Sequence, residues 1–107
     1  MVNAERALDA LGDPTRRRVF ARLREGTCSA GELAEGMNVT RSAVSQHLQV
    51  LRAAGLVVVS ADGTRRLYRV DRRGIAAIRG WLDEFWDDTL DAFKEAAERA
   101  ATKARRS

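Results

Sequence analysis

The sequence TRSAVSQHLQVLRAAG, from Thr40 to Gly55, has the pattern that decides the fold. The hydroxyl of Thr40 can cap the first turn of a helix by accepting a hydrogen bond from a backbone N–H. Gly55 stands where a helix is expected to end in a left-handed residue, a conformation that glycine adopts without steric cost. We therefore predict one helix between these two residues, with a defined start and a defined end.

The two faces of this predicted helix differ in chemistry. Val44, Leu48 and Leu51 fall on one face at about 100° per residue, and His47 lies beside them. In a chain with 32% charged residues, a merely solvated face would carry Glu and Lys. The opposite face instead carries hydroxyls and amides, which hydrogen-bond to base edges. We predict that it contacts DNA bases through Thr40, Arg41, Ser42, Ser45, Gln46 and Gln49.

Shorter helices are predicted upstream. Asn3 can cap a helix that ends at Gly12. Asp13 can cap a second helix that runs from Pro14 to about Arg24, because proline at the first helical position loses only an N–H that would be unpaired anyway.

The segment before Thr40 predicts a helix-turn-helix. Ser29 and Glu32 match a capping box, in which each residue satisfies a backbone N–H near the other, so a third helix starts there. Gly36 closes this helix, and only residues 37–39 separate it from Thr40. Two helices joined by so short a turn, the second with a free polar face, form a helix-turn-helix.

A β-hairpin is predicted over residues 56–70. Its first half is rich in valine, and the Asp-Gly pair at 62–63 favours a tight turn. Thr64, Arg65 and Arg66 follow the turn, where they could reach a phosphate or the minor groove. Polar residues at a hairpin tip are common, so plain solvation is the alternative. We favour the role in DNA contact because the hairpin directly follows the polar helix, which makes it a wing.

A long helix is predicted from the Asp71 cap to about Lys103. Its apolar stripe covers about half of the circumference and contains both tryptophans and two of the three phenylalanines. One small domain can hardly cover such a stripe, so we predict a homodimer, with a fully intramolecular core as the alternative. The predicted dimer interface consists of Leu8, Leu11, Trp81, Leu82, Phe85, Trp86, Leu90 and Phe93.

The length of 107 residues fits one domain. We predict a DNA-binding core at 13–70, with the wing at 56–70, between dimerisation helices at 1–12 and 71–103. No apolar run reaches the roughly 20 residues that a bilayer requires, and the N-terminus lacks a signal-peptide pattern. We therefore expect a cytoplasmic protein with no membrane partner.

The net charge of +4 is unevenly distributed. Residues 1–74 hold 13 Lys and Arg against 8 Asp and Glu, residues 75–98 hold 2 against 7, and residues 99–107 hold 4 against none. The basic part contains the polar helix, which suits attraction to phosphate. Besides the wing residues, the predicted contacts to the DNA backbone are Arg16, Arg17 and Arg52.

Four segments of the chain together match one known family. They are LGDPTRRRVF at 11–20, GELA at 31–34, SAVSQHLQVLRAAGL at 42–56 and GTRRLYRV at 63–70. Through these segments the chain resembles the ArsR/SmtB family of bacterial winged-helix repressors over nearly its whole length. The resemblance implies a mainly helical winged helix-turn-helix fold with the order α-α-α-α-β-β-α, dimerisation through the first and last helices, and repression by covering a promoter.

The metal sites of that family are not matched here. Where its metal sensors carry a Cys-x-Cys pair, this chain has Ser29 and Gly31, which do not ligate a soft metal. We interpret Cys28 as a small buried hydrophobe, with redox sensing as the alternative. The segment WLDEFWDDTL at 81–90 resembles a subgroup that lacks metal sensing and whose inducer is commonly undefined. We predict no metal and no cofactor, although the acidic residues of this helix could offer oxygens to a hard cation.

No catalytic constellation is recognisable in the sequence. His47, the only histidine, lies beside the inward face and is interpreted as a packing residue rather than a catalytic group or a pH switch. No nucleophile, base and orienting group occur at a known spacing. We predict a sequence-specific DNA-binding regulator that is not an enzyme. The alternative is a protein-interaction module whose acidic aromatic helix is the partner surface.

Overall fold

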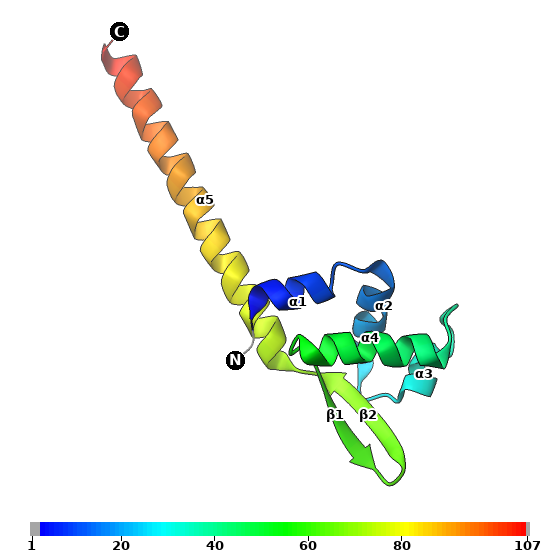
Figure 1. Ribbon diagram of the computed structural model, residues 1–107. Coiled ribbons are helices and arrows are strands. Elements are labelled where there is room, and N and C mark those ends of the chain that lie inside the picture. Colours follow the sequence, from blue (N-terminus) through cyan, green and yellow to red (C-terminus); the bar gives the residue numbers. More distant parts are fainter. Residues whose placement is uncertain (1–2, 107) are drawn as a thin grey trace.

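The computed structural model describes residues 3–106, and the outer ends of the predicted domain, residues 1, 2 and 107, lie outside this range. The predicted order of helices and strands is confirmed, with a short 3-10 helix inserted after the second helix (Figure 1). The elements are α1 (Ala4–Ala10), α2 (Pro14–Arg22), η1 (Leu23–Glu25), α3 (Ala30–Ala34), α4 (Arg41–Ala53), β1 (Val57–Asp62), β2 (Arg65–Val70) and α5 (Arg72–Arg106).

Each predicted cap forms the expected hydrogen bond. Asn3 Oδ1 accepts from the backbone N–H of Glu5 at 2.8 Å, and Asp13 Oδ1 accepts from that of Arg16 at 3.0 Å. Thr40 Oγ1 accepts from the N–H of Ala43 at 3.0 Å. These local signals set the helix starts because a side-chain oxygen satisfies N–H groups that have no partner within the helix.

The capping box at the start of α3 is also confirmed. Ser29 Oγ accepts from the N–H of Glu32, and Glu32 Oε1 accepts from the N–H of Ser29, both at 3.2 Å. At the other end of the helix-turn-helix, Gly55 has a φ of 79°, the left-handed conformation predicted for the end of α4.

Two local predictions need correction. The second helix is α-helical only to Arg22 and then tightens into η1, a common ending for an α-helix. The hairpin turn lies at 63–64, because Asp62 still pairs with Arg65 in the ladder. Gly63 has a φ of 62°, as the first central residue of a two-residue hairpin turn often does.

Cys28 differs from its interpretation as a buried hydrophobe. Its side chain is only half-buried against the core, and its backbone forms an isolated antiparallel bridge with Tyr68 of β2. The Cys28 N–H donates to the Tyr68 carbonyl at 3.0 Å, and the Tyr68 N–H donates to the Cys28 carbonyl at 2.8 Å. This bridge attaches the root of the wing to the segment that leads into α3.

The core lies around the inward face of α4. Val44, Leu48 and Leu51 have no exposed surface, as predicted, and α4 packs against α2, α3, α1 and β1. Burying these three side chains contributes roughly 1.5–3 kcal/mol each. The core fixes the rotation of α4, so its polar face points outward.

Helix α5 crosses the core only at its first turns and then extends away from it (Figure 1). The described part of the chain is 75 Å long in its longest direction. At the start of the helix, the buried Asp71 accepts hydrogen bonds from the N–H of Arg73 at 3.0 Å and from its guanidinium at 2.8 and 3.1 Å. From Arg79 to Arg106 every side chain of this single chain is exposed.

Candidate nucleic-acid interface

The outer face of α4 is polar and open to solvent. Ser42, Gln46 and Gln49 are exposed, and Ser45 is half-buried. Thr40 and Arg41 are also exposed at the start of the helix. This arrangement suits an α-helix that enters a major groove by its first turns, where short polar side chains can reach base edges.

The wing lies next to the start of α4. The wing, the start of α4 and the first residues of α3 together enclose a hollow of about 480 Å³, which we call the wing hollow. Three arginines, Arg41, Arg65 and Arg66, line it together with four residues that carry a hydroxyl group, Ser29, Ser45, Thr64 and Tyr68. The structure therefore brings together residues that the sequence assigned separately to base contact and to the wing.

Arg65 also has a partner that the sequence analysis missed. Its guanidinium forms an ion pair with Glu32 of α3, and both side chains are about half exposed. Glu32 was recognised as part of the capping box, but no sequence signal indicates a partner 33 positions later. The pKa of the Glu32 carboxyl is lowered, chiefly by the hydrogen bond from the Ser29 backbone and less by the charge of Arg65.

The other arginines predicted to contact the DNA backbone lie elsewhere. Arg17 donates to the carbonyls of Leu11 and Gly12 at 2.8 and 3.2 Å, and Arg16 donates to the carbonyl of Ala10. Both therefore bind the carbonyl end of α1, where cations interact favourably with the helix dipole. Arg52 is exposed near the far end of α4, beside Arg6 and Arg73. None of these three lines the wing hollow.

His47 is half-buried on the side of α4 that faces the start of α2. The pKa of Asp13 is lowered chiefly by the hydrogen bond from the Arg16 backbone, and the charge of His47 contributes to a smaller extent. Within residues 3–106, no group of three or more His, Cys, Asp or Glu side chains is arranged to hold a metal ion.

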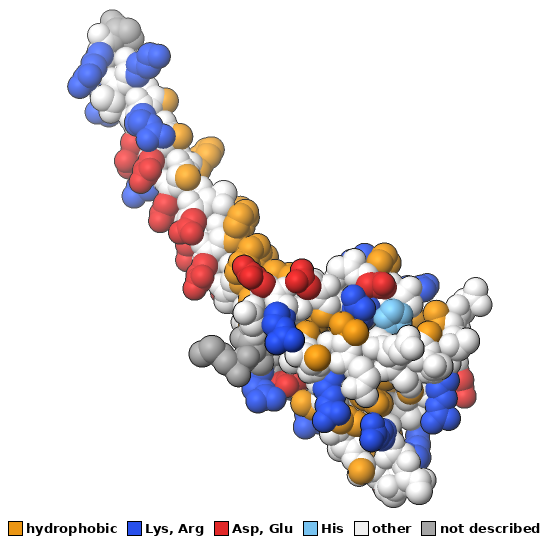
Figure 2. All heavy atoms as spheres, viewed as in Figure 1, with side chains coloured by type: hydrophobic (Ala, Val, Ile, Leu, Met, Phe, Trp, Pro, Cys, Tyr) orange, Lys and Arg blue, Asp and Glu red, His pale blue; other side chains and the backbone are white. Residues whose placement is uncertain are grey.

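Most of the exposed large hydrophobic side chains in residues 3–106 belong to the aromatic stripe of α5. Trp86 is 59% exposed and Phe93 is 73% exposed, and the Trp81 and Phe85 rings stack with their centroids 5.6 Å apart. Figure 2 shows apolar side chains along one edge of the helix and acidic side chains along the other. Leu8 and Leu11, the predicted interface residues outside α5, are half-buried in this single chain.

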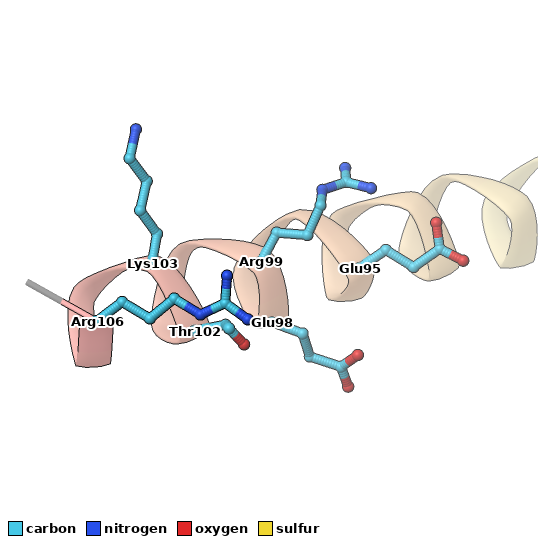
Figure 3. A pocket seen from close by; sticks show the side chains of 6 residues that line it. All are labelled: Glu95, Glu98, Arg99, Thr102, Lys103 and Arg106. Atoms are coloured by element: carbon cyan, nitrogen blue, oxygen red, sulfur yellow. The ribbon is translucent and has the colours of Figure 1, made fainter.

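The last turns of α5 lie away from the core of the domain (Figure 1). A shallow hollow there is lined by Glu95, Glu98, Arg99, Thr102, Lys103 and Arg106, all from this one helix (Figure 3). Figure 3 shows these side chains spreading away from the helix rather than converging on a common point. A surface with one wall cannot enclose a small ligand, so we assign no ligand site here. Among the described helices, none is both long and apolar enough to cross a membrane.

Comparison with known proteins agrees with this geometry. Residues 11–60 match a family described as a helix-turn-helix domain. The chain is 47% identical over 91 residues to the HTH-type transcriptional regulator Rv2034 of Mycobacterium tuberculosis, which covers 85% of each protein. The chain belongs to the ArsR/SmtB family of winged helix-turn-helix transcriptional regulators.

Two further family members support the assignment. The transcriptional repressor SmtB of Mycobacterium tuberculosis is 36% identical over 93 residues, which cover 87% of this chain and 62% of that protein. A solution structure from Mycobacterium bovis, described as a homodimeric winged helix-turn-helix DNA-binding domain of a possible ArsR-family regulator, superposes with a TM-score of 0.63. It is 26% identical and the match covers 80% of each chain.

The resemblance to ArsR/SmtB proteins is thus confirmed. As a member of this family, the chain is a sequence-specific DNA-binding transcriptional regulator. The alternative of a protein-interaction module on a winged scaffold is not favoured, since the relatives are named as regulators of transcription.

Proposed function

We propose that two copies of this ArsR/SmtB chain bind one near-palindromic operator and repress transcription by covering a promoter. The observation that carries the proposal is the polar face of α4, exposed beside an arginine-bearing wing while the opposite face is buried. Each α4 helix would enter one of two successive major grooves, about 34–36 Å apart. A two-fold pair of proteins then requires a two-fold repeat in the DNA.

Base contact is assigned to Thr40, Arg41, Ser42, Ser45, Gln46 and Gln49. Backbone contact is assigned first to Thr64, Arg65 and Arg66 of the wing, because they lie beside the start of α4. Arg16, Arg17 and Arg52 remain predicted backbone contacts. For Arg16 and Arg17 this contact would have to coexist with their bonds to the end of α1.

The dimer would form through the aromatic stripe of α5, with α1 beside it. Exposed apolar patches of this extent are rare on monomeric proteins and mark interaction surfaces. The homodimeric relative from Mycobacterium bovis supports a second copy as the occupant. Apolar and acidic side chains lie on opposite edges of α5, so burying the stripe leaves the acidic edge in water. We assign residues 13–70 to DNA binding, and residues 1–12 and 71–103 to this dimerisation.

We further infer a regulator that acts in the cytoplasm without catalysis and without a bound metal or cofactor. The named relatives are regulators of transcription. The lining of the wing hollow is basic and hydroxylic, which suits recognition of phosphate rather than ligation of a soft metal.

The proposal is tested by fluorescence anisotropy with the promoter fragment that precedes the chain's own coding sequence. We expect the protein to bind this fragment at least a hundredfold more tightly than it binds an unrelated duplex of the same length. The affinity should fall steeply as the salt concentration rises. Equal affinity for both duplexes at every salt concentration would contradict the proposal for this operator, and no binding to either would contradict DNA binding itself.

A further inference from the structure

The wing hollow is polar, basic and built from three separate elements. Ser29 comes from the start of α3, Arg41 and Ser45 come from the first two turns of α4, and Arg65 and Arg66 come from β2. Guanidinium groups and hydroxyls that converge on one space form a typical site for an oxyanion, because they donate several hydrogen bonds and supply positive charge.

Gly31 also lines the hollow. A Cβ placed on Gly31 would lie 3.9 Å from Arg41 Nε and 4.0 Å from both Arg41 Cδ and Ser29 Oγ. The Arg41 side chain therefore lies beside Gly31 of α3, where it lines the hollow. Ser42, Gln46 and Gln49, by contrast, do not line the hollow.

One arginine of the hollow is already paired with a carboxylate that lies outside the lining. Glu32 pairs with the Arg65 guanidinium, and the same carboxylate accepts the Ser29 backbone N–H. A carboxylate in this position stands in for a phosphate, since both are anions whose oxygens accept hydrogen bonds from a guanidinium. A phosphate that enters the hollow must compete with Glu32 for Arg65.

We propose that the wing hollow binds one phosphodiester of the DNA backbone in each half-site, and that Glu32 holds Arg65 until that phosphate replaces it. The proposal rests on the proposed function, because it assigns a specific phosphate to the same DNA interface. It moves Arg41 from the base contacts to the phosphate ligands, where it joins Arg65. It makes Glu32 a positioning residue that weakens DNA binding while keeping the wing against α3.

The variant Glu32→Gln tests the competing carboxylate. Glutamine also satisfies a capping box, so α3 keeps its start while the charge is lost. We expect the affinity for a 30-bp duplex of arbitrary sequence to rise about 1.5- to 5-fold per subunit at low salt, the range for an exposed ion pair. Glu35→Gln removes the same charge from the exposed end of α3 and is the matched control, for which we expect a smaller change. Equal changes in the two variants would overturn the role of Glu32.

A double-mutant cycle shows whether the effect runs through Arg65. In an Arg65→Ala background, Glu32→Gln is expected to change DNA affinity no more than Glu35→Gln does, because the competed guanidinium is gone. Arg65→Ala alone is expected to lower the salt slope by about one unit per subunit. If Glu32→Gln raised DNA affinity as much in the Arg65→Ala background as in wild type, the proposed competition between Glu32 and the phosphate for Arg65 would be contradicted.

Neutral phosphates distinguish a backbone phosphodiester from a free anion. A set of bound duplexes, each with one methylphosphonate, should contain one position per half-site at which wild type loses affinity and Arg65→Ala loses clearly less, because only Arg41 still binds that phosphate. Inorganic phosphate alone, followed by the NMR signals of the arginine Nε–H groups, should shift Arg41 and Arg65 only weakly. If inorganic phosphate binds tightly and no backbone position is sensitive, the hollow is a site for a free anion and the proposal is wrong. Absence of any duplex binding by wild type would instead contradict the proposed function.

Discussion

Gly74 in the first turn of α5 lies directly against the carbonyl of Gly55, at the left-handed turn that ends α4. A Cβ on Gly74 would lie 2.4 Å from the Gly55 oxygen and 2.9 Å from Leu56 Cδ2. Only hydrogen fits there, so this contact sets how closely the long helix approaches the recognition helix. The orientation of α5 relative to α4, and through it the spacing of two α4 helices in a dimer, depends on this pair of glycines.

Replacing Gly74 should therefore destabilise the fold. For Gly74→Ala we expect a loss of about 1–3 kcal/mol in the free energy of unfolding, because the methyl group meets backbone rather than a movable side chain. Gly80→Ala is the matched control on the same helix, where nothing lies within 4 Å. It should stabilise the helix by about 0.5–1 kcal/mol. Urea unfolding measures the free energy of unfolding of both variants. A Gly74→Ala protein as stable as wild type would show that the contact between Gly74 and Gly55 is not tight.

Removing an aromatic side chain from the α5 stripe should weaken the dimer. Trp86→Ala is expected to raise the dimer dissociation constant by about 30-fold, the effect of losing a central aromatic residue from an interface. Asp87→Ala, on the acidic edge of the same helix, should leave association unchanged. Sedimentation velocity over a concentration series measures both, and a wild-type protein that is monomeric at micromolar concentration would contradict the proposed interface.

Losing a contact to a base and losing a contact to the DNA backbone should lower affinity in different ways. Gln46→Ala should cost roughly 1–3 kcal/mol of affinity for the preferred duplex and relax the preference at one base position per half-site. On a random duplex it should cost little, because that binding depends on phosphates. Affinities for a set of single-base operator variants provide the measurement, and equal losses on every sequence would mean that Gln46 only positions the backbone.

The Asp71 cap should make stability fall in acid. Hydrogen bonds from the Arg73 side chain hold the pKa of Asp71 below its ordinary value of 3.8. As the pH falls, Asp71 is therefore protonated in the unfolded chain before it is protonated in the folded one. The stabilisation that the charged Asp71 gives is complete above about pH 4, and it is lost as the pH falls through the lower pKa of the folded state.

Asp71→Asn isolates that charge, because asparagine still caps a helix. Its melting temperature should be a few degrees below that of wild type at pH 7, and the difference should shrink towards pH 2. Thermal unfolding followed by circular dichroism at both pH values is the measurement. A difference that does not change with pH would assign the effect to packing instead.

Local signals in the sequence were sufficient for most of the fold. The caps at Asn3, Asp13, Ser29 and Thr40 were predictable because each acts within three residues of itself. The inward face of α4 was predictable from its helical period. The contacts that the sequence did not indicate are those between distant segments. They are the Cys28–Tyr68 bridge, the Glu32–Arg65 pair and the contact of Gly74 with Gly55.

The same distinction applies to the candidate site. The residue types on α4 and the wing were predicted from local patterns, but their arrangement around one hollow depends on how α3, α4 and β2 pack together. Arg16 and Arg17 show the opposite case. The sequence predicted that they contact the DNA backbone, and tertiary packing gave them the carbonyl end of α1 as a partner.

The most direct test of a two-fold pair on DNA is selection of duplexes from a random library by the purified protein, followed by sequencing. We expect an inverted repeat whose half-site centres lie about 10–10.5 bp apart, the separation of successive major grooves on one face of B-form DNA. Enrichment of a single unrepeated half-site, of half-sites about 5 bp out of phase, or of no sequence at all would contradict it.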